Sequence, residues 1–256
     1  MFLAFDIGNT NIKTGLFHDD DLIEIKFFNE LSELKNYVKQ KEVEQAAISS
    51  VVPQLTEKVS KILSSSINVT PFLIDKNSKF NLKISYDSFE TLGIDRICSA
   101  EGAFAIFKSS NDFENYNGMT FILSIDFGTA TTINIIQFSG EFIGGIIAPG
   151  IGLMFESLKS KTAQLPEVNA EEYKGLIGKD TVSSIASGVI TSSLGVIERT
   201  LNHLKTELNA DDIKIFITGG NAERLLPFLN FKYQYERGLV LIGINQIYNR
   251  NFSSSV

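Results

Sequence analysis

This chain of 256 residues contains very little cysteine and histidine. Its one cysteine, Cys98, excludes an internal disulfide and a cysteine-rich zinc site, because both need several thiols. The two histidines, His18 and His203, lie far apart in the sequence, which argues against a histidine metal site or a Ser-His-Asp triad.

Positive charge is also scarce, since 23 Lys and Arg stand against 30 Asp and Glu, giving a net charge of −7. Nucleic-acid binding relies on Lys and Arg that neutralise phosphates, so no nucleic-acid partner is expected. The apolar run at 1–5 lacks basic residues and ends at Asp6, which is not the pattern of a signal peptide. No uncharged apolar stretch reaches the roughly 18 residues of a membrane helix. We expect a cytoplasmic protein without a membrane association.

Two short stretches of the chain resemble each other. Asp6–Thr10 follows one apolar run, Asp126–Thr132 follows another, and each continues into a second β-rich run. A carboxylate at the end of a buried strand, followed by a glycine-containing turn, can bind phosphate and its counter-ion. Two copies about half a chain apart predict two related lobes that close on one nucleotide.

Hydrophobic periodicity predicts the same order of elements in both halves, namely three strands and then helices alternating with strands. In the first half we expect strands over 1–7, 12–17, 22–28, 46–52 and 71–74, and helices over 31–40, 54–63 and 93–107. In the second half we expect strands over 121–125, 131–138, 141–147, 213–217 and 238–241. The expected helices of this half are 151–158, 180–208, 222–226 and a final helix that ends at 248. Segments 77–92 and 161–179 read as irregular, 108–118 as the link between lobes, and 251–256 as a frayed tail. The sequence therefore predicts an α/β fold with mixed sheets and lobes of 1–115 and 116–256.

The first of the paired loops offers a complete set of groups for a nucleotide. Asp6 can hold Mg²⁺ directly or through water, and Gly8 can adopt a positive φ and admit a phosphate closely. Asn9 and Thr10 can donate to phosphate oxygens, and Lys13 can reach the β- and γ-phosphates. The alternative is an ordinary hairpin, because Asp, Gly and Asn are common turn residues. The chain contains neither a Walker motif nor a Rossmann fingerprint.

Three further motifs have both a functional and a structural interpretation. In Gly93–Arg96, Asp95 can act as a general base and Arg96 can bind a carboxylate, or the pair is a helix N-cap beside an exposed arginine. Thr218–Ala222 can receive a flat ligand or an anion, or it is a tight turn between a strand and a helix. Gly144–Gly152 is a bent strand with a turn, a ligand wall or a subunit contact.

Taken together, the motifs resemble the acetate and sugar kinase/heat-shock protein 70/actin superfamily and, more narrowly, the type III pantothenate kinases. The resemblance covers nearly the whole chain. It rests on motifs in a fixed order and spacing: Asp6–Thr10, Gly93–Arg96, Asp126–Thr132, Gly144-Gly145-x-x-x-Pro149-Gly150, Thr162-Ala163-x-Leu165-Pro166, Gly178–Thr181 and Thr218–Gly220. It implies two duplicated ribonuclease H-like lobes with mixed sheets, in an actin-like ATPase architecture.

The same resemblance implies ATP-dependent phosphorylation of pantothenate to 4'-phosphopantothenate, the first step of coenzyme A biosynthesis. It makes Asp95 the general base, and it makes Asp126 the ligand of a monovalent cation, potassium or ammonium. It assigns ATP and its Mg²⁺ to Asp6, Ile7, Gly8, Asn9, Thr10, Asn11, Ile12, Lys13 and, for ATP, Thr129. It assigns pantothenate to Tyr86, Gly93, Ile94, Asp95, Arg96 and Thr181. Thr181 is expected to act near the interface of a homodimer.

The chain departs from the family pattern at two positions near this pocket. Phe89 stands three residues after Tyr86, where the family often has proline. Ile97 follows the Asp-Arg pair, where the family often has an aromatic residue. Neither change removes a reacting group, but both alter the expected wall of the pocket near Tyr86.

Two other functions compete with this interpretation. One is a different small-molecule kinase of the superfamily, such as a sugar kinase. Such kinases usually carry longer sugar-contact motifs, which are not found in this sequence, and Arg96 favours an acidic substrate. A non-catalytic regulatory relative would not need the intact set of Asp6, Lys13, Asp95 and Asp126. A second, regulatory role beside catalysis is compatible with that set.

Overall fold

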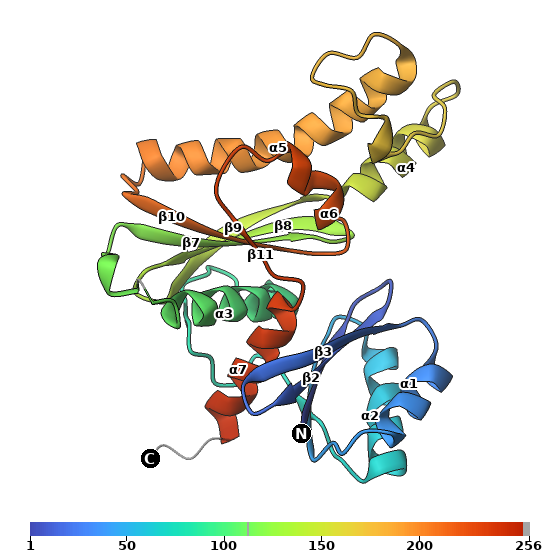
Figure 1. Cartoon of the computed structure of the whole chain (residues 1–256), viewed down its shortest axis with the longest axis vertical. Coiled ribbons are helices and arrows are strands. Elements are labelled where there is room, and N and C mark those ends of the chain that lie inside the picture. The colour runs from blue at the N-terminus through green and yellow to red at the C-terminus, as the bar shows by residue number, and fades with distance from the viewer. Residues whose placement is uncertain (112, 253–256) are drawn as a thin grey trace. The chain divides into compact units, whose positions relative to one another are not determined.

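The structure is a computed structural model that describes residues 1–111 and 113–252, and it separates into two compact units (Figure 1). Unit 1 comprises Met1–Phe113, Gly140–Ile143 and the C-terminal segment that starts at Gly238. Unit 2 comprises Glu114–Ser139 and Gly144–Arg237. These units reflect the density of contacts, whereas the predicted lobes 1–115 and 116–256 reflect duplicated motifs, so the lobe boundaries stay a prediction.

The sheet of unit 1 is mixed, with strand order β3-β2-β1-β4-β5. Its strands are β1 (Phe2–Ile7), β2 (Ile12–His18), β3 (Asp21–Phe28), β4 (Gln45–Ser50) and β5 (Phe72–Leu73). β1, β2 and β3 form antiparallel pairs, while β1, β4 and β5 pair in parallel. This is the mixed sheet that the sequence predicts, with three hairpin strands first and a helix before each later strand.

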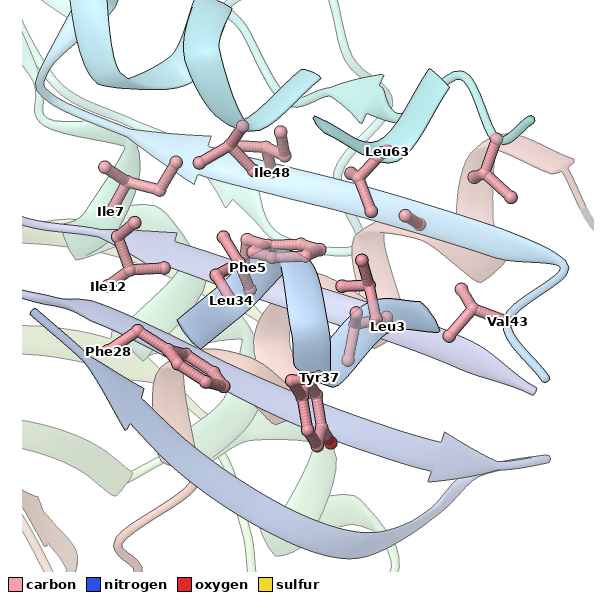
Figure 2. Close-up of a cluster of buried hydrophobic side chains, with 14 of the residues drawn as sticks. Leu3, Phe5, Ile7, Ile12, Phe28, Leu34, Tyr37, Val43, Ile48 and Leu63 are labelled. Atoms are coloured by element: carbon pink, nitrogen blue, oxygen red, sulfur yellow. The ribbon is translucent and has the colours of Figure 1, made fainter. Parts of the chain in front are cut away.

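One face of this sheet is covered by the helices α1 (Leu31–Lys39) and α2 (Pro53–Ile67) (Figure 2). Alternate residues of β1 point into this core because successive side chains of a strand face opposite sides. The largest contributors are aliphatic or aromatic and fully or nearly fully buried: Leu3, Phe5, Ile7, Ile12, Phe28, Leu34, Tyr37, Ile48 and Leu63. Pro53 suits the first position of α2, where no backbone N–H is needed.

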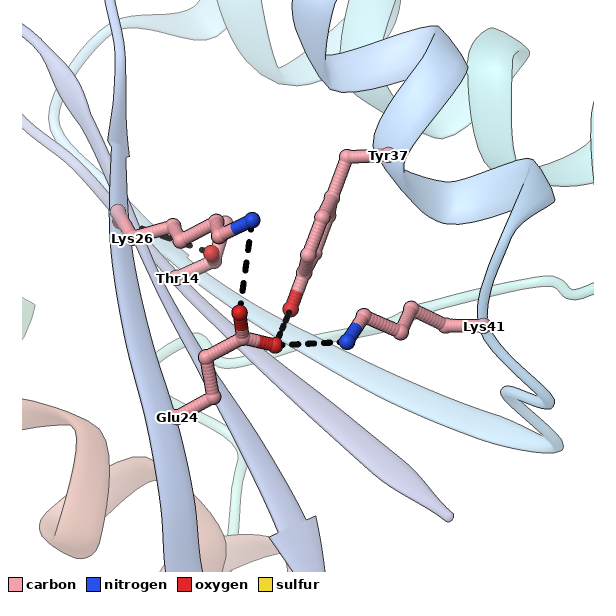
Figure 3. Close-up of polar contacts among 5 residues, drawn as sticks. All are labelled: Thr14, Glu24, Lys26, Tyr37 and Lys41. Carbon is pink, nitrogen blue, oxygen red and sulfur yellow. Dashed lines mark hydrogen bonds and ion pairs between the residues drawn. The ribbon is translucent and has the colours of Figure 1, made fainter.

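A polar cluster centred on Glu24 of β3 lies in unit 1 (Figure 3). The Glu24 carboxylate accepts a hydrogen bond from the Tyr37 hydroxyl at 3.0 Å, and it pairs with the ammonium groups of Lys41 at 2.8 Å and Lys26 at 3.3 Å. The hydrogen bond from Lys41 is the main reason that the pKa of Glu24 falls to about 2. Burial and the nearby carboxylate raise the pKa of Tyr37. The cluster ties β3 to α1 and to the loop that follows it.

The other face of the sheet packs on α3 (Ile94–Lys108) and α7 (Leu239–Phe252). These two helices cross very closely. A Cβ atom added at Gly102 would lie 2.1 Å from the carbonyl oxygen of Leu239, and one at Gly243 would lie 1.8 Å from that of Cys98. Only glycine therefore permits this approach of the two backbones.

The strand predicted over 238–241 is wrong. Residues from Leu239 onward form the start of α7, and the last strand, β11 (Gln234–Tyr235), ends earlier in the chain. A short apolar run fits a buried strand or a buried helix equally well, and the contact with α3 decides in favour of the helix. α7 also extends past 248 to Phe252, so Asn251 and Phe252 are helical, and the rest of the expected frayed tail lies outside the described residues.

Unit 2 contains most of a second mixed sheet, whose full strand order is β11-β10-β7-β8-β9-β6. The remaining strands are β6 (Lys83–Ile84), β7 (Thr120–Phe127), β8 (Ala130–Gln137), β9 (Glu141–Pro149) and β10 (Asp212–Thr218). β6 pairs with Glu141 and Phe142 at the start of β9, all within unit 1. The helices of unit 2 are α4 (Ile151–Lys161), α5 (Thr181–Thr206) and α6 (Ala222–Leu225), and α5 runs along one face of the unit 2 strands (Figure 1).

Single helical turns occupy the loops: Phe89–Thr91, Phe113–Asn115, Ala170–Glu172 and Leu226–Phe228. The predicted link 108–118 contains the point where unit 1 gives way to unit 2, although residue 112 lies outside the described part.

Helix α5 is long and apolar enough to span a membrane if length and composition alone are considered. The sequence prediction did not anticipate this, because serines and threonines interrupt its apolar residues. Of its most apolar window, 44% is buried inside the structure. One such helix is weak evidence for a membrane span.

Candidate functional site

The first paired loop places Asp6 opposite a lysine. Asp6 is the second-last residue of β1, pairs with Lys13 across the antiparallel hairpin, and lies beside Ser49 of the parallel neighbour β4. Residues directly opposite each other on paired strands share a face, so these three side chains face the α3 and α7 side of the sheet. Lys13 is only 8% exposed, and its Nζ lies 5.8 Å from the centroid of the Phe27 ring.

The turn of this hairpin differs from the expectation for Gly8. The Gly8 N–H donates to the carbonyl oxygen of Asn11 at 3.2 Å, which closes the turn. Gly8 does not adopt a positive φ, so that expectation is wrong; within the described residues, positive-φ glycines are Gly140, Gly144, Gly175 and Gly219. A Cβ at Gly8 would find only the Asn11 oxygen nearby, at 3.9 Å, so the glycine leaves open space at the tip of the loop.

Asp95 lies in the first turn of α3, and the N-cap residue of this helix is Gly93. The interpretation of Asp95 as the N-cap is therefore wrong. Its Oδ1 accepts a hydrogen bond from the backbone N–H of Arg96 at 2.9 Å. A Cβ at residue 93 would lie 2.3 Å from that oxygen, so a side chain there would push the carboxylate aside. Gly93 thus leaves room for the Asp95 carboxylate to accept the hydrogen bond from Arg96.

Asp6 and Asp95 approach the same buried thiol, that of Cys98 on α3. Burial raises the pKa of the Cys98 thiol well above its usual range, and the carboxylates of Asp6, Asp95 and Glu101 act in the same direction. Asp6 lies on the face of the sheet that packs on α3, and Asp95 lies in the first turn of α3. The two carboxylates that the sequence singles out in the first half therefore both belong to the layer of unit 1 that contains α3.

Arg96 contacts the ring of Tyr86 and also the ring of Phe142, a residue that belongs to none of the sequence motifs. The Arg96 guanidinium carbon lies 5.8 Å from the ring centroids of both Tyr86 and Phe142, and Arg96 is only 5% exposed. The two rings meet at 6.1 Å with an interplanar angle of 65°. Phe142 is the second residue of β9 and pairs with Ile84 of β6, so the β6–β9 ladder brings it to Tyr86. A planar cation between two aromatic rings is held in a defined orientation.

The loop that carries Tyr86 is fastened to α3 by a buried carboxylate. Glu101 accepts hydrogen bonds from the backbone N–H groups of Asn81 at 2.7 Å and Leu82 at 2.9 Å, and from the Asn81 side chain at 3.0 Å. Burial raises the pKa of Glu101, although these hydrogen bonds act in the opposite direction. The loop therefore keeps a fixed distance from the helix that bears Asp95 and Arg96.

In unit 2, Asp126 lies near the end of β7 with hydroxyls on its own face. It pairs with Thr132 across the hairpin and with Thr218 of the parallel strand β10. The Thr218 hydroxyl is fully buried and has no hydrogen-bond partner among the described residues. A carboxylate beside an unsatisfied buried hydroxyl is a donor set that fits a cation.

The turn after β10 packs directly on this hairpin. Gly219 has φ +104°, and a Cβ there would lie 2.5 Å from Asp126 Oδ1 and from the backbone of Phe127. The Asn221 N–H donates to the Phe127 carbonyl at 2.9 Å, and its side-chain amide donates to the Gly128 carbonyl at 3.1 Å. The Thr218–Gly220 and Asp126–Thr132 motifs thus meet at one end of the sheet.

Thr181 lies apart from that hairpin in the chain, at the start of α5. The preceding Asp180 caps the helix, because its carboxylate accepts from the Ser183 N–H at 2.8 Å. A cavity of about 630 Å³ lies here, lined by Leu158, Leu165, Gly178, Lys179, Asp180, Thr181, Ser184, Ile185 and Gly188. This hollow is wide open to solvent, so it would leave much of a bound molecule exposed.

Comparison with known proteins assigns the chain to a family. Residues 2–203 match the family model of the type III pantothenate kinases. The chain belongs to the type III pantothenate kinase family. Among curated type III pantothenate kinases, that of Sulfurihydrogenibium sp. is 34% identical over 95% of this chain and 98% of the relative. That of Agathobacter rectalis is 32% identical over 98% and 97%, respectively.

Solved structures support the fold of this type III pantothenate kinase family member. A Campylobacter jejuni protein described as a candidate Baf family transcriptional activator aligns with a TM-score of 0.60 and 21% identity, covering 98% of this chain and all of that one. A Listeria monocytogenes protein described as a candidate N-acetylmannosamine kinase aligns with a TM-score of 0.50 and 14% identity, covering 97% and 98%. The predicted actin-like ATPase architecture is confirmed.

Sequence reasoning missed three side chains around the Tyr86 loop of this family member: Lys76, Glu101 and Phe142. Phe142 lies inside a strand, where an aromatic residue suggests only packing. Glu101 lies inside a helix, where a glutamate suggests only an exposed helix face. Lys76 lies in an irregular loop without any periodicity. The one available signal was Phe89 in place of the family's proline, since its ring contacts Lys76 and Phe80.

Proposed function

We propose that this protein transfers the γ-phosphoryl group of ATP to pantothenate, giving 4'-phosphopantothenate in the first step of coenzyme A biosynthesis. The membership of the chain in the type III pantothenate kinase family carries this proposal. The placement of Asp6 on the sheet face that packs on α3, and of Asp95 in the first turn of α3, supports it, because phosphate-binding and proton-accepting groups must act on one substrate pair. The expected location is the cytoplasm.

In this proposal the first hairpin and Thr129 hold the nucleotide. Residues 6–13 supply the Asp6 carboxylate for Mg²⁺, loop amides for phosphate oxygens, and the Lys13 ammonium. Bound Mg²⁺ supplies neutralisation of phosphate charge. The low exposure of Lys13 supports its role, because a poorly solvated ammonium acts strongly on a nearby anion.

Asp95 acts as the general base in this reaction. Its carboxylate accepts the proton of the pantothenate hydroxyl as the hydroxyl oxygen bonds to the γ-phosphorus and the bond to ADP breaks. The Arg96 guanidinium, oriented by Tyr86 and Phe142, pairs with the substrate carboxylate. Gly93 and Ile94 line the substrate beside these groups.

Asp126 holds a monovalent cation, potassium or ammonium, and Thr181 contacts pantothenate near a homodimer interface. The buried hydroxyl of Thr218 beside Asp126 supports the first part. The second part is supported by the cavity at Thr181 and by Leu176 and Ile177, which are 67% and 82% exposed just before it. Large exposed apolar side chains of this kind favour burial against another subunit.

A coupled kinase assay with purified protein tests the proposal. Pantothenate is offered against a panel of sugars, with and without potassium or ammonium, and only pantothenate with the cation should be turned over. Preference for a sugar would identify a different kinase of the superfamily. ATP binding without turnover of any acceptor would identify a regulatory relative.

Asp95→Asn isolates the proton-transfer role. The substitution keeps the shape and the hydrogen bond from the Arg96 N–H but removes the base, so kcat should fall about 100-fold or more. Circular dichroism should show an unchanged fold. Unchanged turnover in the purified variant would remove Asp95 from this role.

A further inference from the structure

Lys76 lies in the irregular loop after β5 and belongs to none of the motifs described above. Its ammonium donates a hydrogen bond to the carbonyl oxygen of Leu92 and lies 4.7 Å from the centroid of the Phe89 ring. Leu92 directly precedes Gly93, the N-cap of α3. Lys76 therefore contacts the chain immediately before the helix that bears Asp95.

The segment that Lys76 contacts is a single tight turn over Ser88–Leu92. The Thr91 N–H donates to the Ser88 carbonyl at 3.0 Å, and the Leu92 N–H donates to the Phe89 carbonyl at 3.1 Å. Lys76 touches the aromatic ring at one end of this turn and the carbonyl at the other. One side chain thus spans the turn and fixes where α3 begins.

The charge of Lys76 also interacts with that of Asp95. Burial lowers the pKa of Lys76, whereas the carboxylates of Glu90 and Asp95 act to raise it. The structural link between Lys76 and Asp95 is the hydrogen bond of Lys76 to the Leu92 carbonyl, three residues before Asp95 in the chain.

We propose that Lys76 is a positioning residue for phosphoryl transfer: its ammonium holds Phe89 and Leu92 and thereby fixes the Asp95 carboxylate at the start of α3. This inference rests on the proposed function, in which Asp95 is the general base. A misplacement of a reacting group by about 1 Å can lower a rate about 100-fold, so a tether one residue from the helix start has leverage on catalysis.

Three variants separate the tether from general stability. Lys76→Met keeps a long flexible side chain that can pack on Phe89 but removes the donor and the charge. Lys76→Arg restores a cation that can donate to the Leu92 carbonyl and stack on the ring. Lys41→Met is the matched control, because Lys41 also lies over an aromatic ring, that of Tyr37 at 5.3 Å, and pairs with Glu24 instead of contacting the α3 start.

The first measurement is amide hydrogen exchange, which needs no substrate. Lys76→Met should speed exchange at residues 94–98 at least tenfold, while Lys76→Arg and Lys41→Met should stay near the wild type. Unchanged exchange at the start of α3 in Lys76→Met would overturn the inference. If Lys76→Met does not fold, Phe89→Leu, which removes the ring and leaves the lysine, should show the same local effect at a smaller size.

The second measurement is steady-state kinetics with pantothenate. Lys76→Met should lower kcat at least tenfold with an unchanged KM for ATP. Lys76→Arg should recover most of kcat. The control Lys41→Met should keep kcat while lowering the melting temperature. A kcat within twofold of wild type in Lys76→Met, or an equal loss in the arginine variant, would overturn the inference. An inactive wild type with fast exchange in Lys76→Met would instead sink the proposed function and leave the tether standing.

Discussion

The hairpins that begin at Asp6 and Asp126 share one backbone plan but differ in what stands opposite the carboxylate. In unit 1 the position across the hairpin is the nearly buried Lys13, and the turn tip at Gly8 opens to free space. In unit 2 the corresponding position is Thr132, and the Gly219 turn presses on the carboxylate. In the proposed function, one scaffold serves opposite charges: the hairpin with a lysine and an open loop binds an anion, and the hairpin with hydroxyls and a closed turn binds a cation.

The largest effect expected from this comparison follows from Lys13→Met. The variant removes the ammonium that distinguishes the first hairpin, so kcat should fall about 100-fold and the KM for ATP should rise. Steady-state kinetics measures both values. Lys26→Met on β3 is the control and should keep kcat near the wild type; equal losses in both variants would show that Lys13 has no special place.

Asp126 of the second hairpin should govern the response of the enzyme to a monovalent cation. Asp126→Asn should abolish stimulation by potassium or ammonium and leave the activity at the level that the wild type shows without either cation, because the charged ligand is lost. A titration with potassium chloride at constant ionic strength measures this. Asp212→Asn, at the far end of β10, should keep the stimulation; a surviving potassium response in Asp126→Asn would contradict the assignment.

Glycine substitutions test the open and closed turns directly. Gly219→Ala forces a side chain into a left-handed backbone and against Asp126, so it should destabilise the protein by about 1–3 kcal/mol. Gly8→Ala meets only one atom at 3.9 Å and should cost less than about 1 kcal/mol, acting mainly on the KM for ATP. Melting curves of both variants give the order, and equal destabilisation would erase the contrast between the two turns.

The smallest effect lies at Glu24, beside the first hairpin but outside its site. Because its pKa in the folded state is lowered to about 2, its stabilising contribution is present above the unfolded value of 4.5 and is lost as the pH falls toward 2. Glu24→Gln should therefore lower the free energy of unfolding at pH 7 by about 1 kcal/mol, after allowance for solvent screening, and the melting temperature should fall with it. Near pH 2 the substitution should have little effect. The kcat should not change.

The sequence was sufficient for the paired hairpins, because a buried strand, a turn glycine and a second strand are local patterns. It was misleading for 238–241, where four residues cannot show whether an apolar run is a strand or the first turn of a helix that crosses α3. Gly8 was expected to adopt a positive φ, but the Asn11 carbonyl closes the turn without it. Contacts between distant segments, such as those of Glu101 with Asn81 and of Lys76 with Leu92, have no periodicity and could not be predicted.

The close crossing of α3 and α7 has a consequence for how the chain is made. The apolar face of the first sheet that contains Phe2, Ala4 and Phe17 is completed by Val240, Leu241 and Ile244, which are synthesised long after it. Until α7 has been made, that face of the nascent chain has nothing from α7 to cover it. The first sheet must therefore wait for α7 before it can finish folding, and a stop codon before Gly238 would leave an exposed apolar surface for chaperones or proteases to recognise.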